Sequence, residues 1–129
     1  MIDKKIEALL DGISHLKGAS NPDSITYQIK NPLHIRSFGL PGRHEIDEEG
    51  RRVFSSWLAG YRACLYDLKV KLTGESRSKL KTTDPLSYLL NVYDIKEKLG
   101  QQQVVRFVRR ALKDESVQLD TPLNYFVQD

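Results

Sequence analysis

The sequence has few of the residues and runs that mark secreted or membrane proteins. A single cysteine, Cys64, excludes an internal disulfide and favours a reducing compartment. No apolar run approaches the roughly 20 residues that a bilayer-spanning helix needs. The N-terminal stretch mixes charged residues into its apolar positions, which is unlike a secretory signal. These absences predict a cytoplasmic protein without a membrane segment.

The motifs of several common enzyme classes are also missing. There is no glycine-rich phosphate loop and no G-x-S-x-G elbow, which disfavours nucleotide hydrolysis and esterase chemistry. His34, His44 and Glu45 lack the spacing that holds zinc in a fixed geometry, so we expect no metal site and no cofactor. Cys64 falls on the apolar stripe of a predicted helix, which predicts a small buried hydrophobe rather than a nucleophile.

Length and charge limit the number of domains and the class of partner that the protein can have. With 129 residues, 40% of them hydrophobic and 29% charged, the chain is predicted to form one globular domain. After Lys113 it has four acidic residues and no lysine or arginine, so the first 113 residues carry 20 positive charges and 17 less four, or 13, negative ones. That net charge of +7 favours an anionic polymer as partner, either a nucleic acid or a cell-wall glycan.

Hydrophobic periodicity predicts a mainly α domain with about four principal helices. Apolar residues recur at three- and four-residue intervals over 2–17, 57–72, 85–94 and 101–113. Residues 25–29 alternate apolar with polar side chains and are rich in β-branched and aromatic types, which predicts a short strand. A helical turn is expected after Pro122.

Glycines and caps predict where these helices begin and end. Gly18 should stop the first helix, and Gly100 should separate the last two. Asp84 is expected to cap the third helix, with Pro85 as its first helical residue. Gly60 interrupts the second helix; either it lets another backbone pack closely against the helix, or it is simply tolerated there.

The long connector from 31 to 54 is predicted to be irregular, with a small hairpin turning at 47–50, because it contains many helix breakers: Pro32, Gly39, Pro41, Gly42 and Gly50. Connectors of this length are often functional, so we expect the site here. Ser55 or Ser56 should cap the helix that follows. Its largely buried stripe is expected to comprise Trp57, Tyr61, Cys64, Leu65 and Leu68.

The connector contains clustered carboxyl groups that suit general acid chemistry. Glycosidic cleavage needs a protonated carboxyl, often with a second carboxylate beside it. Glu45 is the preferred acid because His44 and Ile46 flank it and favour partial desolvation, and Asp47 is the next candidate. The alternative is that these residues form a solvated turn.

A second set of charged residues lies on the last helix. Arg106, Arg109, Arg110 and Lys113 recur at helical intervals and can contact the phosphates of a nucleic acid. The alternative is again a solvated basic face. No helix-turn-helix spacing accompanies these residues.

The order of several short motifs resembles a family of lysozyme-like domains of phage and bacterial proteins that act on peptidoglycan. The matching pieces are Asn31-Pro32-x-x-Ile35-Arg36, Phe54-x-Ser56, Gly60-x-Arg62-Ala63 and Thr83 before a helix, over about residues 31–112. The family typically shows N-P-G-N-[IL]-R, a variable hairpin, F-x-S/T and a G-x-x-A helix. The resemblance implies a peptidoglycan-like polysaccharide as partner and, as its binding residues, Asn31, Arg36, Arg51, Arg52 and Arg62.

Two departures separate the chain from that family. Leu33 and His34 replace the Gly-Asn of its opening motif. In related enzymes a catalytic glutamate lies near the end of the preceding helix, whereas here that helix ends in His15-Leu16-Lys17. The resemblance therefore implies the helical fold more directly than it implies catalysis. A small basic nucleic-acid-binding protein and a non-catalytic phage structural or scaffold protein remain as alternatives.

Overall fold

The computed structural model describes residues 2–36, 45–74 and 79–128, and in these residues the fold is all-α, as predicted. Its elements are α1 (Ile2–Leu16), α2 (Ile25–Ile29), α3 (Trp57–Leu72), α4 (Leu86–Val92), α5 (Lys98–Leu112) and the 3-10 helix η1 (Leu123–Val127). The described segments contain no helix that is both long and apolar enough to cross a membrane.

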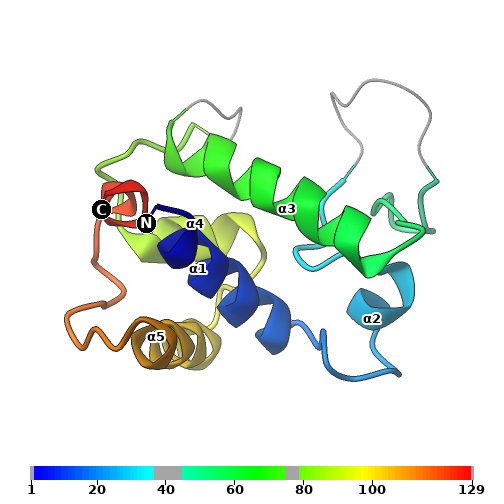
Figure 1. Ribbon diagram of the computed structural model, residues 1–129, viewed down its shortest axis with the longest axis horizontal. Helices are drawn as coiled ribbons and strands as arrows, with labels where there is room; N and C mark the ends of the chain where they lie inside the picture. The colour runs from blue at the N-terminus through cyan, green and yellow to red at the C-terminus, as the bar shows by residue number, and fades with distance from the viewer. Residues whose placement is uncertain (1, 37–44, 75–78, 129) are drawn as a thin grey trace.

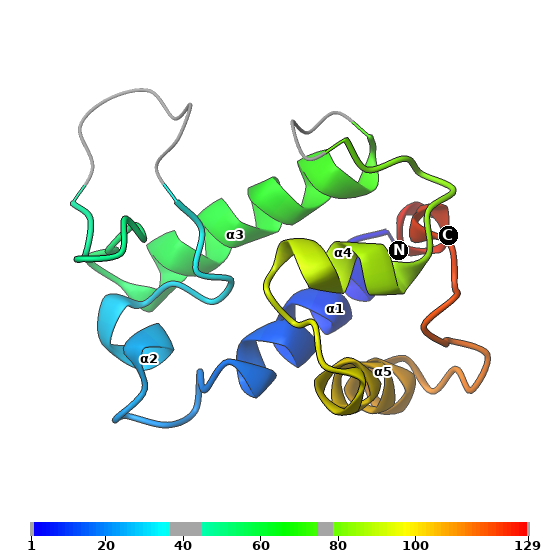
Figure 2. The same cartoon turned by 180° about the vertical axis from the view of Figure 1, so that it is seen from behind.

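Helix α1 is the central element of the core. It lies between α3 and α5 (Figures 1 and 2) and packs against both of them and against η1. One face of α1 is almost inaccessible to solvent because its apolar residues meet these three neighbours. The side chains on that face are Ile6, Leu9, Leu10 and Ile13.

The predicted helix boundaries are confirmed at some ends and wrong at others. Ser56 caps α3, because its Oγ accepts the backbone N–H of Ala59 at 3.1 Å. At α4 the cap position is Pro85, and Asp84 instead accepts the N–H of Lys81 at 2.8 Å, closing the turn before the helix. Gly100 lies inside α5, where a Cβ would meet Ile95 and Leu16 at 3.4 Å.

The strand predicted at residues 25–29 is wrong, since these residues form the short helix α2. Ser24 starts it by accepting the N–H of Tyr27 at 3.1 Å, and Lys30 ends it in the left-handed region at φ 55°. The helix buries Thr26 and Ile29 and leaves Tyr27 47% exposed. The alternating pattern gave the wrong prediction because a five-residue segment is too short to distinguish the period of a helix from that of a strand.

The stripe on α3 is buried only from its second turn onward. Cys64, Leu68 and Leu72 are inaccessible to solvent, and burial raises the pKa of the Cys64 thiol to about 12, as expected for a structural cysteine. Trp57, predicted to be buried, is 36% exposed. It lies in the first turn of α3, at the end that Figure 1 shows next to α2 and away from η1.

The described parts of the connector pair through isolated bridges and not through strands. Arg36 bridges Arg51, and Ile46 bridges Arg52. The N–H of Arg52 donates to the carbonyl of Ile35 at 2.9 Å, so the segment before α3 lies against the segment after α2. Residues 37–44, which include His44, lie outside the described residues, and the full hairpin remains a prediction.

Candidate ligand-binding site

The site is built around a close backbone contact between α2 and α3. A Cβ placed on Gly60 would lie 1.8 Å from the carbonyl oxygen of Lys30, so only glycine allows the first turn of α3 to lie this close to the end of α2. Of the two interpretations of Gly60 that the sequence left open, the structure supports the close approach of another backbone. It places Tyr27 and Lys30 of the α2 segment beside Trp57 of α3.

Asn31 fixes the chain immediately after this contact. Its side-chain amide donates to the carbonyls of Ile35 at 2.9 Å and Arg52 at 2.8 Å, and its Oδ1 accepts the N–H of Ile35 at 3.0 Å and the thiol of Cys64 at 3.4 Å. Asn31 is fully buried. Its amide is thus committed to the fold, and its predicted role in binding is replaced here by a structural one.

Residues 31–34 form a tight turn. His34 takes the left-handed conformation at φ 58°, and its N–H donates to the carbonyl of Asn31 at 3.3 Å. Its Nε2 lies within hydrogen-bond distance of the hydroxyl of Thr26. Burial, and next the positive charges of Lys17 and Arg51, lower the pKa of His34 to about 4. His34 is therefore neutral at neutral pH.

A pocket of about 620 Å³ opens where α1, α2 and the start of α3 meet, and we call it the aromatic pocket. Two exposed aromatic side chains, Tyr27 and Trp57, line it. Its remaining walls contain polar side chains and come from α1, from the α1–α2 loop, from the residue that ends α2 and from one residue of α5. They comprise Asp11, Ser14, His15, Ala19, Ser20, Lys30 and Phe107.

Asp11 is the carboxyl group of this pocket. Partial burial raises its pKa, the hydroxyl of Tyr61, which donates to its Oδ1 at 3.3 Å, lowers it, and the nearby charge of Glu7 raises it again. The net effect is a pKa above the ordinary value for aspartate. The structure therefore places a carboxyl with acid character in the pocket, although not one of those predicted from the sequence.

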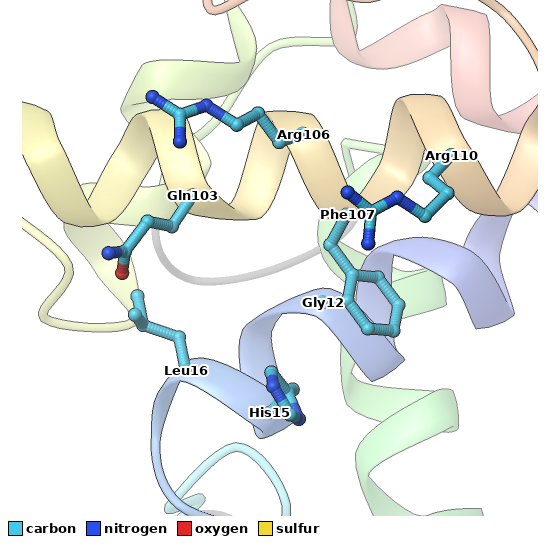
Figure 3. Close-up of a pocket in the computed structure, with 7 residues that line it drawn as sticks. All are labelled: Gly12, His15, Leu16, Gln103, Arg106, Phe107 and Arg110. Carbon is cyan, nitrogen blue, oxygen red and sulfur yellow. The ribbon is translucent and has the colours of Figure 1, made fainter.

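A second pocket of about 410 Å³, which we call the arginine pocket, adjoins the first (Figure 3). Gly12, His15 and Leu16 of α1 form one side of it, and Gln103, Arg106, Phe107 and Arg110 of α5 form the other. His15 and Phe107 line both pockets, and their ring centroids are 5.7 Å apart. The two pockets therefore share a wall made of these rings.

The basic residues predicted on α5 do not act as one face. Arg106 and Arg110 line the arginine pocket. Arg109 is half-buried, and its Nε donates to the carbonyl of Val117 at 2.6 Å, which holds the segment after α5. Lys113 ends the helix in the left-handed conformation at φ 53°. Half of the predicted set is thus available to a ligand of this pocket.

The carboxyl groups predicted as catalytic lie in the turn before α3, away from both pockets. Desolvation opposes the ionisation of Asp47, but the N–H and guanidinium of Arg51 and the N–H of Glu49 outweigh it and hold the pKa of Asp47 below its ordinary value. Asp47 is thereby kept as a carboxylate and does not suit a general acid. Glu45 is exposed and lines neither pocket.

The arginines predicted to bind substrate are only partly brought together. Arg36 and Arg52 line a separate pocket of about 320 Å³ beside α3. Arg51 pairs with Asp47 at 2.7 Å and with Glu49 at 3.2 Å. Arg62 is exposed on α3 and lines neither the aromatic nor the arginine pocket. None of these four residues reaches the aromatic pocket.

Sequence reasoning missed the aromatic side chains of the site. Phe107 carried a usable signal, because it stands beside Arg106 and outside the apolar stripe of its helix. In the structure Phe107 is half-buried, and its ring lies on the wall that the two pockets share. Tyr27 and Trp57 carried none, since the first was assigned to a strand and the second continued an apolar stripe.

Comparison with protein-family models, with curated protein sequences and with solved structures finds no match to this chain. Within residues 2–36, 45–74 and 79–128 no group of three histidine, cysteine, aspartate or glutamate side chains is placed to hold a metal ion. The functional argument therefore rests on the geometry of the two pockets and on the sequence resemblance.

Proposed function

We propose that this protein is a lysozyme-like domain that binds a peptidoglycan-type polysaccharide in the aromatic pocket. The observation that carries the proposal is the pair of exposed aromatic rings, Tyr27 and Trp57, on the walls of an open pocket that also contains polar side chains. The order of sequence motifs supports the same class of ligand. A cytosolic location, inferred from the sequence, belongs to this proposal.

The chemistry of a sugar matches these walls. A pyranose ring has flat faces of C–H groups that pack on aromatic rings, and hydroxyls around its edge that need hydrogen-bonding partners. Asp11, Ser14 and Lys30 provide such partners on the same pocket as Tyr27 and Trp57. One pocket thus offers both kinds of contact that a sugar ring requires.

We propose binding without hydrolysis. Glycosidases usually place two carboxyl groups on either side of the scissile bond, whereas the described lining of the aromatic pocket contains one, Asp11. At the helix end where the resembled enzymes have a catalytic glutamate, this chain has His15, Leu16 and Lys17. The candidates Glu45 and Asp47 lie elsewhere.

A specific observation also favours a nucleic acid as the alternative ligand. Arg106 and Arg110 stand on either side of Phe107 in the sequence of α5 and line the same pocket. Cationic side chains beside an aromatic ring are a common arrangement for binding single strands, where bases stack and phosphates are neutralised. This alternative requires binding that falls steeply with salt.

Co-sedimentation with cell-wall sacculi tests the proposal. Wild-type protein should pellet with sacculi without releasing reducing ends, and Trp57→Ala and Tyr27→Ala should each lower the pelleted fraction. Tyr88→Ala is the matched control, because Tyr88 is 55% exposed on α4 and lines neither pocket. An equal loss in all three variants, or no pelleting at all, would remove the aromatic pocket as a glycan site.

Release of reducing ends would add catalysis to the proposal and is tested with Asp11→Asn. Cleavage that stops in this variant assigns the acid to the aromatic pocket. Cleavage that survives it and stops in Glu45→Gln returns the chemistry to the connector. A scaffold protein without chemistry predicts failure in both glycan and nucleic-acid assays.

A further inference from the structure

The arginine pocket carries an inference that rests on the proposed function and deepens it. Its described lining contains two arginines and no carboxylate, whereas the aromatic pocket next to it contains both Asp11 and Lys30. Positive charge is therefore concentrated at one end of the paired pockets. Such a pocket attracts a negative group on whatever ligand occupies its neighbour.

The two guanidinium groups have no partner among the described residues. Arg106 and Arg110 are exposed, lie four residues apart on α5, and make no hydrogen bond or ion pair with any residue in the described segments. Arg51 and Arg109, by contrast, are bonded within the fold. A guanidinium presents several N–H donors in a planar fork that fits a carboxylate or phosphate. The donors of Arg106 and Arg110 are available for that purpose.

The shared wall links this charge to the sugar site. His15 and Phe107 belong to both pockets, so a ligand lying against Tyr27 and Trp57 continues past these rings to the arginines. Figure 3 shows Phe107 and Arg110 extending from α5 toward α1, whereas the side chain of Arg106 extends along α5, away from the labelled side chains of α1. A polymer chain is suited to this layout because its next residue enters the second pocket.

We propose that the polysaccharide is an acidic one, and that Arg106 and Arg110 bind the carboxylate of the sugar adjacent to the one held by Tyr27 and Trp57. The aromatic pocket provides affinity for the sugar ring. The arginine pocket selects chains that carry negative charge.

Two hexasaccharides of equal length test the selection. Chitohexaose is neutral, and the hyaluronan hexasaccharide carries a carboxylate on every second sugar. Trp57 is the single tryptophan of the chain and lines the aromatic pocket, so its fluorescence reports binding of either probe. At low salt the acidic hexasaccharide should bind about tenfold more tightly, as expected for one added charge-assisted contact.

The variant Arg106→Gln/Arg110→Gln should abolish this preference, so that the acidic hexasaccharide binds no more tightly than chitohexaose. Glutamine retains helix propensity, and the melting temperature should confirm that α5 is intact. Arg62→Gln is the matched control, since Arg62 is an exposed arginine on α3 that lines neither pocket. An acidic preference that persists in the double variant would overturn the inference.

The same titrations separate the inference from the proposed function. If chitohexaose binds and the acidic probe binds no better, the inference fails and the glycan site stands. If neither hexasaccharide binds, the proposed function fails with it. A hexathymidylate that binds more tightly than both sugars, and is lost in the double variant, would identify the arginine pocket as a nucleic-acid site instead.

Discussion

The turn at residues 45–52 and the arginine pocket between α1 and α5 both contain arginines, but in opposite states. In the turn, Asp47 and Arg51 are bonded to each other at 2.7 Å, and Asp47 also accepts two backbone N–H groups. In the pockets, Arg106 and Arg110 are without partners among the described residues. The first set of charges shapes the backbone, and the second set is available to a ligand.

This difference explains why the sequence singled out the turn rather than the two pockets. Clustered charges in a long connector resemble a site, but a carboxylate beside an arginine satisfies that arginine before any ligand arrives. The arginines of α5 appeared to be one basic face, yet only Arg106 and Arg110 line the arginine pocket, and Arg109 is bonded to the carbonyl of Val117. Charge composition alone does not distinguish charged side chains that are paired within the fold from those that are available to a ligand.

The largest effect is expected for a substitution at the contact between α2 and α3, because that contact positions both regions. Gly60→Ala forces a Cβ into the carbonyl of Lys30, so the backbone of one segment must move. We expect destabilisation of about 3 kcal/mol, the upper part of the usual range for overpacking. Denaturant unfolding measures the change.

Gly100→Ala is the control for helix propensity. A Cβ there meets only the ends of Ile95 and Leu16 at 3.4 Å, so we expect a change of less than about 1 kcal/mol. Equal stability losses at Gly60 and Gly100 would contradict the account of the close backbone contact.

The next effect concerns the turn alone. Asn31→Ala removes the amide that joins Ile35 to Arg52 and leaves buried backbone groups without partners. We expect a loss of about 2 to 3 kcal/mol in the free energy of unfolding. Asn124→Ala is the comparison, because no side-chain hydrogen bond of Asn124 is formed within the described residues. A loss no larger than that of Asn124→Ala would mean that Asn31 does not fix the turn.

Helix content was predictable from the sequence because it follows from repeated apolar spacing, whereas the contact that builds the site does not. Gly60 was recognisable as a break in a helix, but its partner, the carbonyl of Lys30, is a backbone atom without a sequence signal. Trp57 continued the stripe of Cys64 and Leu68, and only the position of α2 decides that it stays exposed. The site therefore depends on tertiary placement rather than on a local pattern.

Two matched substitutions compare the carboxyl group of Asp47 in the turn with that of Asp11 in the aromatic pocket. Asp47→Asn removes the ion pair with Arg51 and should destabilise the fold by up to about 1 kcal/mol while leaving chitohexaose binding unchanged. Asp11→Asn should weaken binding and leave the melting temperature at pH 7 unchanged or slightly raised, because the raised pKa of Asp11 means that its charge is disfavoured in the fold. Reversed outcomes would place the ligand at the turn.

A further expected effect is a pH dependence that originates beside the turn. The folded pKa of His34 is about 4 against an ordinary value of 6.5, so between these values the unfolded chain binds more protons than the folded one. Stability should therefore be lost as pH falls from about 6.5 to about 4 and be fully present above that window. The groups that act on His34 include Lys17 and Arg51, which oppose its protonation, and Asp47 and Asp94, which favour it.

Melting temperatures of wild type and His34→Asn across this window measure the effect. Asparagine tolerates the left-handed backbone of position 34 and does not titrate, so the variant should show a shallower fall between pH 6.5 and 4 even if it is less stable at pH 7. Parallel curves for wild type and His34→Asn would mean that His34 is as free to accept a proton in the fold as in the unfolded chain. The charges of the turn would then have no effect on the pKa of His34. Only the ion pair between Asp47 and Arg51 would then distinguish the turn from the arginine pocket.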